Sequence, residues 1–172
     1  MAKMHNRRTI RLKGYDYTQA GAYHVTICVQ DRKCLFGDIQ NGEMVLNDIG
    51  KTVNNCWIEI PKHFPRVTLD EYIVMPNHLH GIIVIVGAND YSPLQNMKSI
   101  QHPHGTSKTI GSVIRGFKIG VIKWARQNTN IKNIWQRNFY EHIIRNEKDL
   151  NCTREYIVNN PAEWEEDEYY PV

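Results

Sequence analysis

The segment MPNHLHGIIVIV, residues 75–86, decides the fold. Its second half, Ile82–Val86, is an unbroken apolar and largely β-branched run, which is typical of a central strand buried on both faces. Pro76 and Asn77 separate this strand from an earlier strand-like run over residues 67–75. Because Pro and Asn favour turns, the sequence predicts an antiparallel pair joined by a hairpin at the centre of a sheet.

Further strands and helices are predicted on both sides of this pair. Residues 22–29 (AYHVTICV) are rich in β-branched and aromatic residues and predict a strand. Asn41-Gly42 lies between two short alternating runs and indicates a type I′ hairpin, in which both central residues need a positive φ. Residue spacing predicts the remaining elements, which are helices over residues 49–63, 107–127 and 147–159 and a strand near residues 141–145.

The predicted order of elements is strand, hairpin, helix, strand, strand, helix, strand, helix. A mixed order with a hairpin at its centre favours the α+β class with an antiparallel sheet. We therefore expect a ferredoxin-like (RRM-like) antiparallel sheet with helices on one face. The length of 172 residues suits one domain, divided into a basic N-terminal arm (1–14), a core (15–163) and an acidic tail (164–172).

Charge is unevenly distributed along the chain. The formal charge is only +3, but no carboxylate occurs between Asp90 and Glu141. A long basic stretch without compensating acids predicts contact with a nucleic-acid backbone. The candidate DNA-binding side chains are Arg7, Arg8 and Arg11 in the arm, Lys108, Arg115, Lys118, Lys123 and Arg126 on the predicted helix, and Arg137 nearby.

The acidic tail and the remaining composition limit the functional classes. Residues 163–168 are rich in Glu and Asp; we expect a solvated end, with competition against DNA for the basic helix as a second hypothesis. The longest apolar run is far shorter than the roughly 20 residues of a membrane-spanning helix, and the N-terminus lacks the apolar segment of a secretory signal. The four cysteines are scattered, as is typical of reduced cytosolic thiols. We expect a cytoplasmic protein without a membrane partner.

Two histidines follow the Pro-Asn break with one residue between them. On a strand, His78 and His80 project from one face and Leu79 from the other, toward the core. Two imidazoles in this arrangement can bind one metal ion, although this spacing alone also occurs in ordinary polar strand faces. A second pair, His102 and His104, lies in a long polar loop, and we expect it to be solvated.

The last predicted helix carries a tyrosine near its end. Tyr156 and Asn160 are four residues apart and therefore share a helix face. A hydroxyl and an amide oxygen could thus address one site. Asn160 precedes Pro161, so a simple role at the helix C-terminus is equally expected.

The ordered combination of NHLHG after a strand, the segment WQRNFYEHIIRNEKDL and a tyrosine-bearing helix ending in YIVNNP resembles the small single-tyrosine HUH transposases. Within them, the chain resembles the REP-associated tyrosine transposases, which are relatives of the IS-two-hundred-like insertion-sequence transposases. The resemblance runs from about residue 15 to residue 163 and includes GYDYTQAGAYHVTICVQDRKCLFG and GEMVLNDIG. The long loop over residues 87–106 and the acidic tail depart from the family pattern.

This resemblance implies a transposase that cleaves and rejoins hairpin-forming single-stranded DNA with palindromic repeats. His78 and His80 match the HUH metal ligands, and Asn160 matches a third, weaker ligand. Tyr156 matches the nucleophile, which forms a 5′-phosphotyrosine; Tyr140 is a rival that the family context disfavours. Mg²⁺ or Mn²⁺ is the expected ion, although imidazoles would also accept Zn²⁺. Relatives include monomers and homodimers, and both remain compatible with the sequence.

Two other functions are compatible with the residues. One is a non-catalytic single-stranded nucleic-acid-binding module of ferredoxin-like fold, and the other is a metal hydrolase in which the histidine pair activates water. Neither explains why Tyr156 and Asn160 occur together. His142 either faces the same surface as the histidine pair or is a packing residue, and Trp135 and Phe139 either stack on bases or fill the core.

Overall fold

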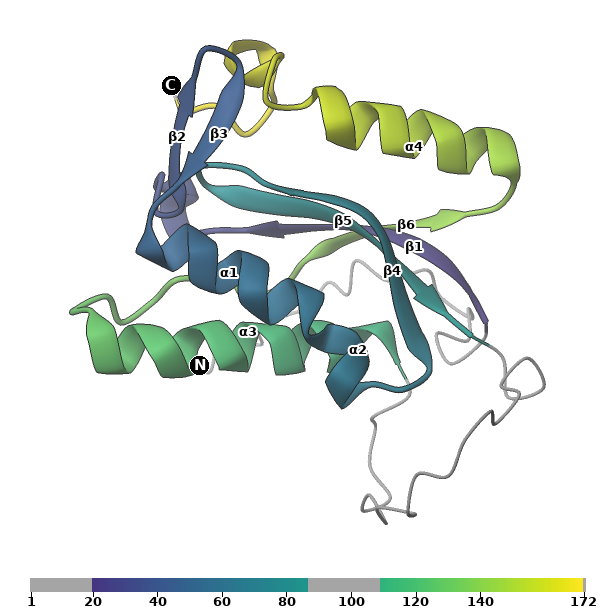
Figure 1. Ribbon diagram of the computed structural model, residues 1–172, viewed down its shortest axis with the longest axis horizontal. Coiled ribbons are helices and arrows are strands. Elements are labelled where there is room, and N and C mark those ends of the chain that lie inside the picture. The colour runs from purple at the N-terminus through teal and green to yellow at the C-terminus, as the bar shows by residue number, and fades with distance from the viewer. Residues whose placement is uncertain (1–19, 87–108, 172) are drawn as a thin grey trace, which may run out of the picture.

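The computed structural model describes residues 20–86 and 109–171 (Figure 1). Its centre is a four-stranded sheet with the strand order β4-β5-β1-β6, in which all neighbours are antiparallel. The hairpin predicted at Pro76-Asn77 joins β4 to β5, and β5 is buried along nearly its whole length. The strands are β1 (Gly21–Cys28), β4 (Val67–Val74), β5 (His78–Ile85) and β6 (Tyr140–Ile144).

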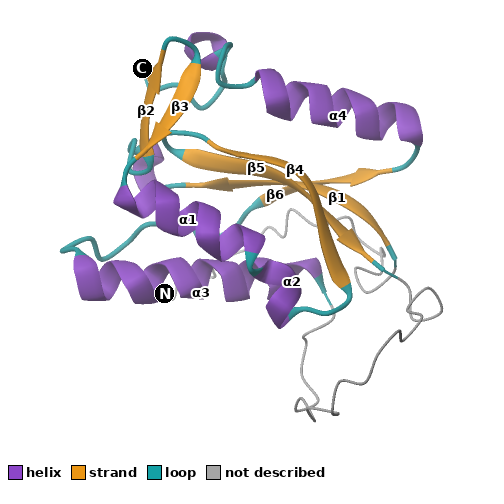
Figure 2. Cartoon of the chain, in the orientation of Figure 1, coloured by secondary structure: helices purple, strands orange, loops and turns teal. Residues whose placement is uncertain are grey.

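Helices cover both faces of this sheet (Figures 1 and 2). Three of them, α1 (Asp48–Ile58), α2 (Ile60–His63) and α3 (Ile110–Asn128), lie on one face. The last helix, α4 (Glu147–Asn159), lies on the other face. The expected α+β antiparallel fold is confirmed, and the expectation of helices on one face holds for all helices except α4. Because Thr153 and Ile157 are its only buried residues, α4 has a narrow packing surface and leaves room for polar groups beneath it.

The main core fills the space between the sheet and helices α1 and α3. Leu79 and Ile83 of β5 pack there with Trp57 of α1 and Phe117 of α3. Gly81 points to the same side, and a Cβ at this position would lie 2.3 Å from Cζ2 of Trp57. Glycine after the histidine pair is therefore required by the close approach of the Trp57 ring to the sheet.

Local signals explain the boundaries of the smaller elements. Strands β2 (Gly37–Gln40) and β3 (Glu43–Leu46) form the hairpin predicted at Asn41-Gly42, whose φ angles are 53° and 77°. Asn47 caps α1 by accepting a hydrogen bond from the Gly50 amide. The predicted helix over residues 49–63 is divided at Glu59, just before Pro61, into α1 and α2. Helix α4 has the predicted bounds and is capped by Asn146.

The acidic tail packs on the α4 side of the sheet (Figure 1). Trp164, which begins the short 3₁₀ helix Trp164–Glu166, and Tyr169 are buried with Cys28 and Met75. Glu163, Glu165, Glu166 and Glu168 are exposed, as expected of a solvated end. The segment is nevertheless not free in solvent, because the buried Trp164 and Tyr169 anchor it to the sheet. The tail also lies across the sheet from α3, which removes the basis for the hypothesis that it competes with DNA for that helix.

Candidate active site

The two histidines at the start of β5 lie together beneath α4. The rings of His78 and His80 have centroids 4.5 Å apart, and the two side chains are almost completely buried. Leu79, between them, points into the main core. The predicted alternation along this strand is thus confirmed.

Each histidine is oriented by a polar group on its outer nitrogen. Asn77 Oδ1 lies 2.8 Å from His78 Nδ1, and Thr26 Oγ1 lies 2.9 Å from His80 Nδ1. The Asn77 amide nitrogen donates to the carbonyls of Arg32 and Tyr169, which fixes the amide orientation. An amide oxygen only accepts, so the proton of His78 sits on Nδ1 and its Nε2 lone pair faces the site. Metal-binding histidines commonly have such outer partners.

Helix α4 places the predicted nucleophile directly over this pair. The Tyr156 hydroxyl is 3.3 Å from His80 Nε2, and the Tyr156 side chain keeps 41% of its surface exposed. Asn160, one turn later, is buried. The structure therefore brings all four predicted metal and catalytic residues, His78, His80, Tyr156 and Asn160, into one site.

Two buried acceptors in this site lack partners within the described part of the chain. His78 Nε2 and Asn160 Oδ1 make no hydrogen bond, and leaving such groups unpaired costs about 1–3 kcal/mol each. Asp167 lies beside them: ligand atoms of His78, His80 and Asp167 are within 4.8 Å of one another, and Asn160 donates its amide hydrogen to Asp167. Two imidazoles, an amide oxygen and a carboxylate form a donor set that fits a divalent cation.

Sequence reasoning missed Asp167. It lies in the acidic tail, which was expected to be solvated, and acidic residues at a chain end give no signal of their own. Trp164 and Tyr169, on either side of it, are the signal that could have found it, because large aromatic residues rarely stay in water.

Burial keeps both imidazoles neutral. Burial, together with the positive charge of Arg32, lowers the pKa of His78 to about 3. It also holds the pKa of His80 well below its ordinary value, with further contributions from His78 and His24. Neutral imidazole is the form that binds metals.

The tyrosine is protonated in this arrangement. Burial, together with the carboxylates of Asp167 and Glu168, raises the pKa of Tyr156 to about 12. Its hydroxyl must therefore lose a proton as it attacks rather than beforehand.

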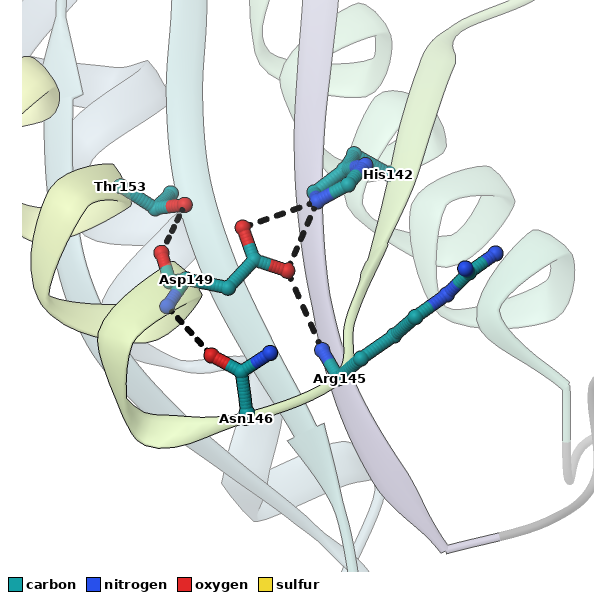
Figure 3. A network of polar contacts seen from close by, with 5 residues as sticks. All are labelled: His142, Arg145, Asn146, Asp149 and Thr153. Atoms are coloured by element: carbon teal, nitrogen blue, oxygen red, sulfur yellow. Dashed lines mark hydrogen bonds and ion pairs between the residues drawn. The ribbon is translucent and has the colours of Figure 1, made fainter.

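Tyr140 and His142, on β6, face the same side of the sheet. They pair with Thr26 and His24 of β1, which lies between β6 and the histidine strand. Tyr140 is thus two strands away from His80, whereas Tyr156 contacts it. His142 Nε2 is 3.0 Å from a carboxylate oxygen of Asp149 (Figure 3). This contact joins β6 to α4 and favours a structural role for His142.

The candidate DNA-binding residues of α3 lie across the sheet from this site. Arg115, Lys123 and Arg126 are exposed on α3. Lys118 is different, because its ammonium donates to the carbonyls of Gln136 and Asn138. Burial lowers the pKa of Lys118 to about 8. Arg7, Arg8, Arg11, Lys108 and the loop histidines His102 and His104 lie outside the described residues.

The two aromatic residues considered for base stacking, Trp135 and Phe139, pack against the main core. Trp135 is buried between Phe36 and Phe117, which favours core packing over base stacking. Phe139 is partly buried against the same core.

Within residues 20–86 and 109–171, no helix is long and apolar enough to cross a membrane.

The sheet order, the buried histidine pair and the tyrosine helix above it define a ferredoxin-like HUH fold. No protein-family model matches the chain. It is 53% identical over 173 residues to an uncharacterized protein of Haemophilus influenzae, covering 98% of this chain and 96% of the relative. A putative REP-associated tyrosine transposase of the same organism is 26% identical, covering 86% of this chain and 73% of the relative.

Two further comparisons point to the same family. A REP-associated tyrosine transposase of Escherichia coli is 23% identical, covering 85% of this chain and 69% of the relative. The fold is similar to a solved REP-associated tyrosine transposase bound to a REP hairpin, with a TM-score of 0.62, 21% identity and coverage of 87% of this chain and 72% of that one. The chain is thus similar in sequence and in fold to REP-associated tyrosine transposases. This relationship supports a transposase function.

Proposed function

We propose that this protein is a metal-dependent single-tyrosine transposase that cleaves and rejoins hairpin-forming single-stranded DNA. The observation that carries the proposal is the Tyr156 hydroxyl 3.3 Å from His80 Nε2, next to the unpaired acceptors of His78 and Asn160. The REP hairpin bound to the related structure supports DNA hairpins of this kind as the substrate.

Four residues of this chain would hold the ion, which we propose to be Mg²⁺ or Mn²⁺. These are His78, His80, Asn160 and, in addition to the residues expected from the sequence, Asp167. A bound divalent ion supplies positive charge that stabilises a phosphate oxygen during attack. The unpaired nitrogen and oxygen described above support this ligand set.

Tyr156 performs the covalent step. Its hydroxyl oxygen forms a bond to the scissile phosphorus, while the bond from phosphorus to the 3′-oxygen breaks. The phenolic proton passes to solvent water during attack, and the departing 3′-oxygen takes a proton from solvent water to give a free 3′-hydroxyl. The 5′-phosphotyrosine retains the phosphodiester energy, so a second 3′-hydroxyl can reverse the step and join two strands without ATP.

The site is complete within one chain. Tyr156 from α4 and the histidines from β5 meet without a contribution from a second copy. We therefore propose that the protein can act as a monomer, and a homodimer is not needed to assemble the site.

The test is covalent trapping on DNA. An end-labelled single-stranded hairpin incubated with Mn²⁺ should give a protein–DNA adduct that survives denaturation. Tyr156→Phe should abolish the adduct, and Tyr140→Phe, the matched control on the same face, should retain it. An adduct formed by Tyr156→Phe would show that the nucleophile is assigned wrongly.

The same experiment distinguishes the two alternative functions. A non-catalytic binding module would bind DNA without cleaving it, and chelators would not affect that binding. A metal hydrolase would release cleaved product without a covalent adduct.

A further inference from the structure

An open cavity of about 670 Å³ lies between α3 and the segment that enters β6. Helix α3 covers the face of the sheet opposite to α4 and the tyrosine site (Figure 1). The walls of the cavity include Ile114, Ile122 and Phe139, and the exposed side chains of Arg115 and Arg137 border it. The volume lies within the range of typical ligand sites. The cavity therefore combines an apolar and aromatic interior with a cationic edge.

Glu141 lines this cavity. It pairs with Val25 of β1, whose side chain is buried in the main core, so Glu141 points to the α3 side of the sheet. Both of its carboxylate oxygens are buried, and neither has a hydrogen-bond partner within the described residues. A neighbouring cation, Lys118, donates instead to two backbone carbonyls. A buried carboxylate without donors is costly and requires an explanation.

A nucleotide explains this combination of groups. Proteins recognise unpaired bases by apolar and aromatic contact together with hydrogen bonds to the base edge, and basic side chains bind the adjoining phosphates. Two adjacent carboxylate oxygens need two adjacent donors. Guanine offers N1–H and the N2 amino group side by side, whereas the pairing edges of adenine, cytosine and thymine place an acceptor next to each donor.

We propose that this cavity binds an unpaired guanine of the DNA substrate, with Glu141 accepting hydrogen bonds from N1–H and N2–H and Arg137 contacting a neighbouring phosphate. The inference rests on the proposed DNA substrate and adds base selectivity to it. Strand β6 then contributes side chains to both faces of the sheet. Tyr140 and His142 face the tyrosine site, and Glu141 would bind the base on the opposite face.

The experiment measures DNA affinity by fluorescence anisotropy, without metal, so that cleavage does not interfere. The probe is a DNA hairpin with a single-stranded thymidine flank, in which dG, deoxyinosine or dA replaces one thymidine at each position in turn. At one position the protein should bind dG about tenfold more tightly than dA, and deoxyinosine, which lacks the N2 amino group, should also bind more weakly than dG. Glu141→Gln should reduce the dG preference to twofold or less, and Arg137→Ala should weaken all probes equally.

Each result decides the inference. Equal affinities of the unmodified protein for dG and deoxyinosine at every position would overturn the inference. This comparison does not depend on whether the variants are stable. An unchanged dG preference in Glu141→Gln would also overturn the inference. If the Tyr156 adduct forms but no base preference exists, the inference fails alone; if the chain binds no DNA, the inference and the proposed function fail together.

Discussion

Asn77 connects three parts of the molecule through one side chain. Its oxygen accepts from His78, and its nitrogen donates to the carbonyls of Arg32 and Tyr169. The residue thus fixes the tautomer of a proposed ligand and holds the tail at the same time. Its importance follows from geometry, since an asparagine after a proline would otherwise indicate only a turn.

Replacing Asn77 should weaken metal binding. In Asn77→Ala the His78 ring loses the acceptor that fixes its tautomer and orientation, and loss of such an outer partner typically lowers metal affinity by about 10–100-fold. Titration of free Mn²⁺ by electron paramagnetic resonance measures this change. Asn128→Ala, which removes an exposed asparagine whose side chain donates to the Trp124 carbonyl, is the control and should bind Mn²⁺ normally. Equal affinities in the two variants would contradict the assigned role.

At the scale of elements, α4 is held at both edges of the sheet. Arg154 forms a two-pronged ion pair with Asp70 of β4, and Asp149 binds His142 of β6. Strands β4 and β6 are the two edge strands. The helix that carries Tyr156 therefore spans the sheet between two polar contacts, with only a small apolar contact beneath it.

The Asp70–Arg154 pair should contribute stability that disappears in acid. The hydrogen bond from Arg154 holds the pKa of Asp70 below its ordinary value of 3.8, so the pair stabilises the fold above that pH and loses its contribution as the pH falls through the lowered folded-state pKa. Asp70→Asn should reduce the free energy of unfolding by about 0.5–1 kcal/mol at pH 7. Urea unfolding at pH 7 and in progressively more acidic buffers tests this. A difference between variant and wild type that stays constant with pH would argue against the pair.

The contact between Gly81 and Trp57 gives a prediction about the core. Gly81→Ala places a methyl group against the Trp57 ring, and overpacking of this kind costs roughly 1–3 kcal/mol. Gly120→Ala is the matched control, because a Cβ there would lie 3.3 Å from the Cys56 sulfur and alanine is favoured in a helix by about 1 kcal/mol. Thermal unfolding should show a clear loss for the first variant and little loss for the second. Comparable losses would contradict the packing argument.

At the scale of the whole molecule, the tail is part of the folded structure. Trp164 and Tyr169 cover His78, with ring centroids 5.9 Å and 4.7 Å from it. Asp167 lies between Trp164 and Tyr169 in the sequence, and its carboxylate lies beside His78 and His80 in the structure. A segment that looks dispensable in sequence thus contributes to both the packing and the proposed metal site.

Truncation after Glu163 should therefore have two effects. Loss of the buried Trp164 and Tyr169 should lower the free energy of unfolding by roughly 2–4 kcal/mol, and loss of Asp167 should weaken Mn²⁺ binding. Chemical denaturation and calorimetric titration measure the two effects. The control is the double variant Glu165→Ala, Glu166→Ala, which removes exposed tail charges and should change neither. A truncated chain as stable as the full one would show that the tail does not dock.

Most of the fold could be predicted from local patterns. Alternation, helical spacing and turn residues such as Asn41-Gly42 act between neighbours, so they identified the elements and their order. The histidine pair and the tyrosine followed from the same spacings together with the family resemblance. The face on which α4 lies, the docking of the tail and the cavity beside Glu141 depend on contacts between distant residues, and no local pattern encodes them.

The three hydrogen bonds of Asn77 also have a thermodynamic consequence. The docked tail supplies Asp167 and the backbone carbonyl that holds Asn77, while Asn77 orients His78. If the docked tail increases the affinity for the ion, the bound ion must favour tail docking by the same factor, because coupling between two equilibria is reciprocal. Metal concentration should then control how often the end of the chain leaves the sheet, so hydrogen exchange of residues 164–171 would slow as Mn²⁺ is added.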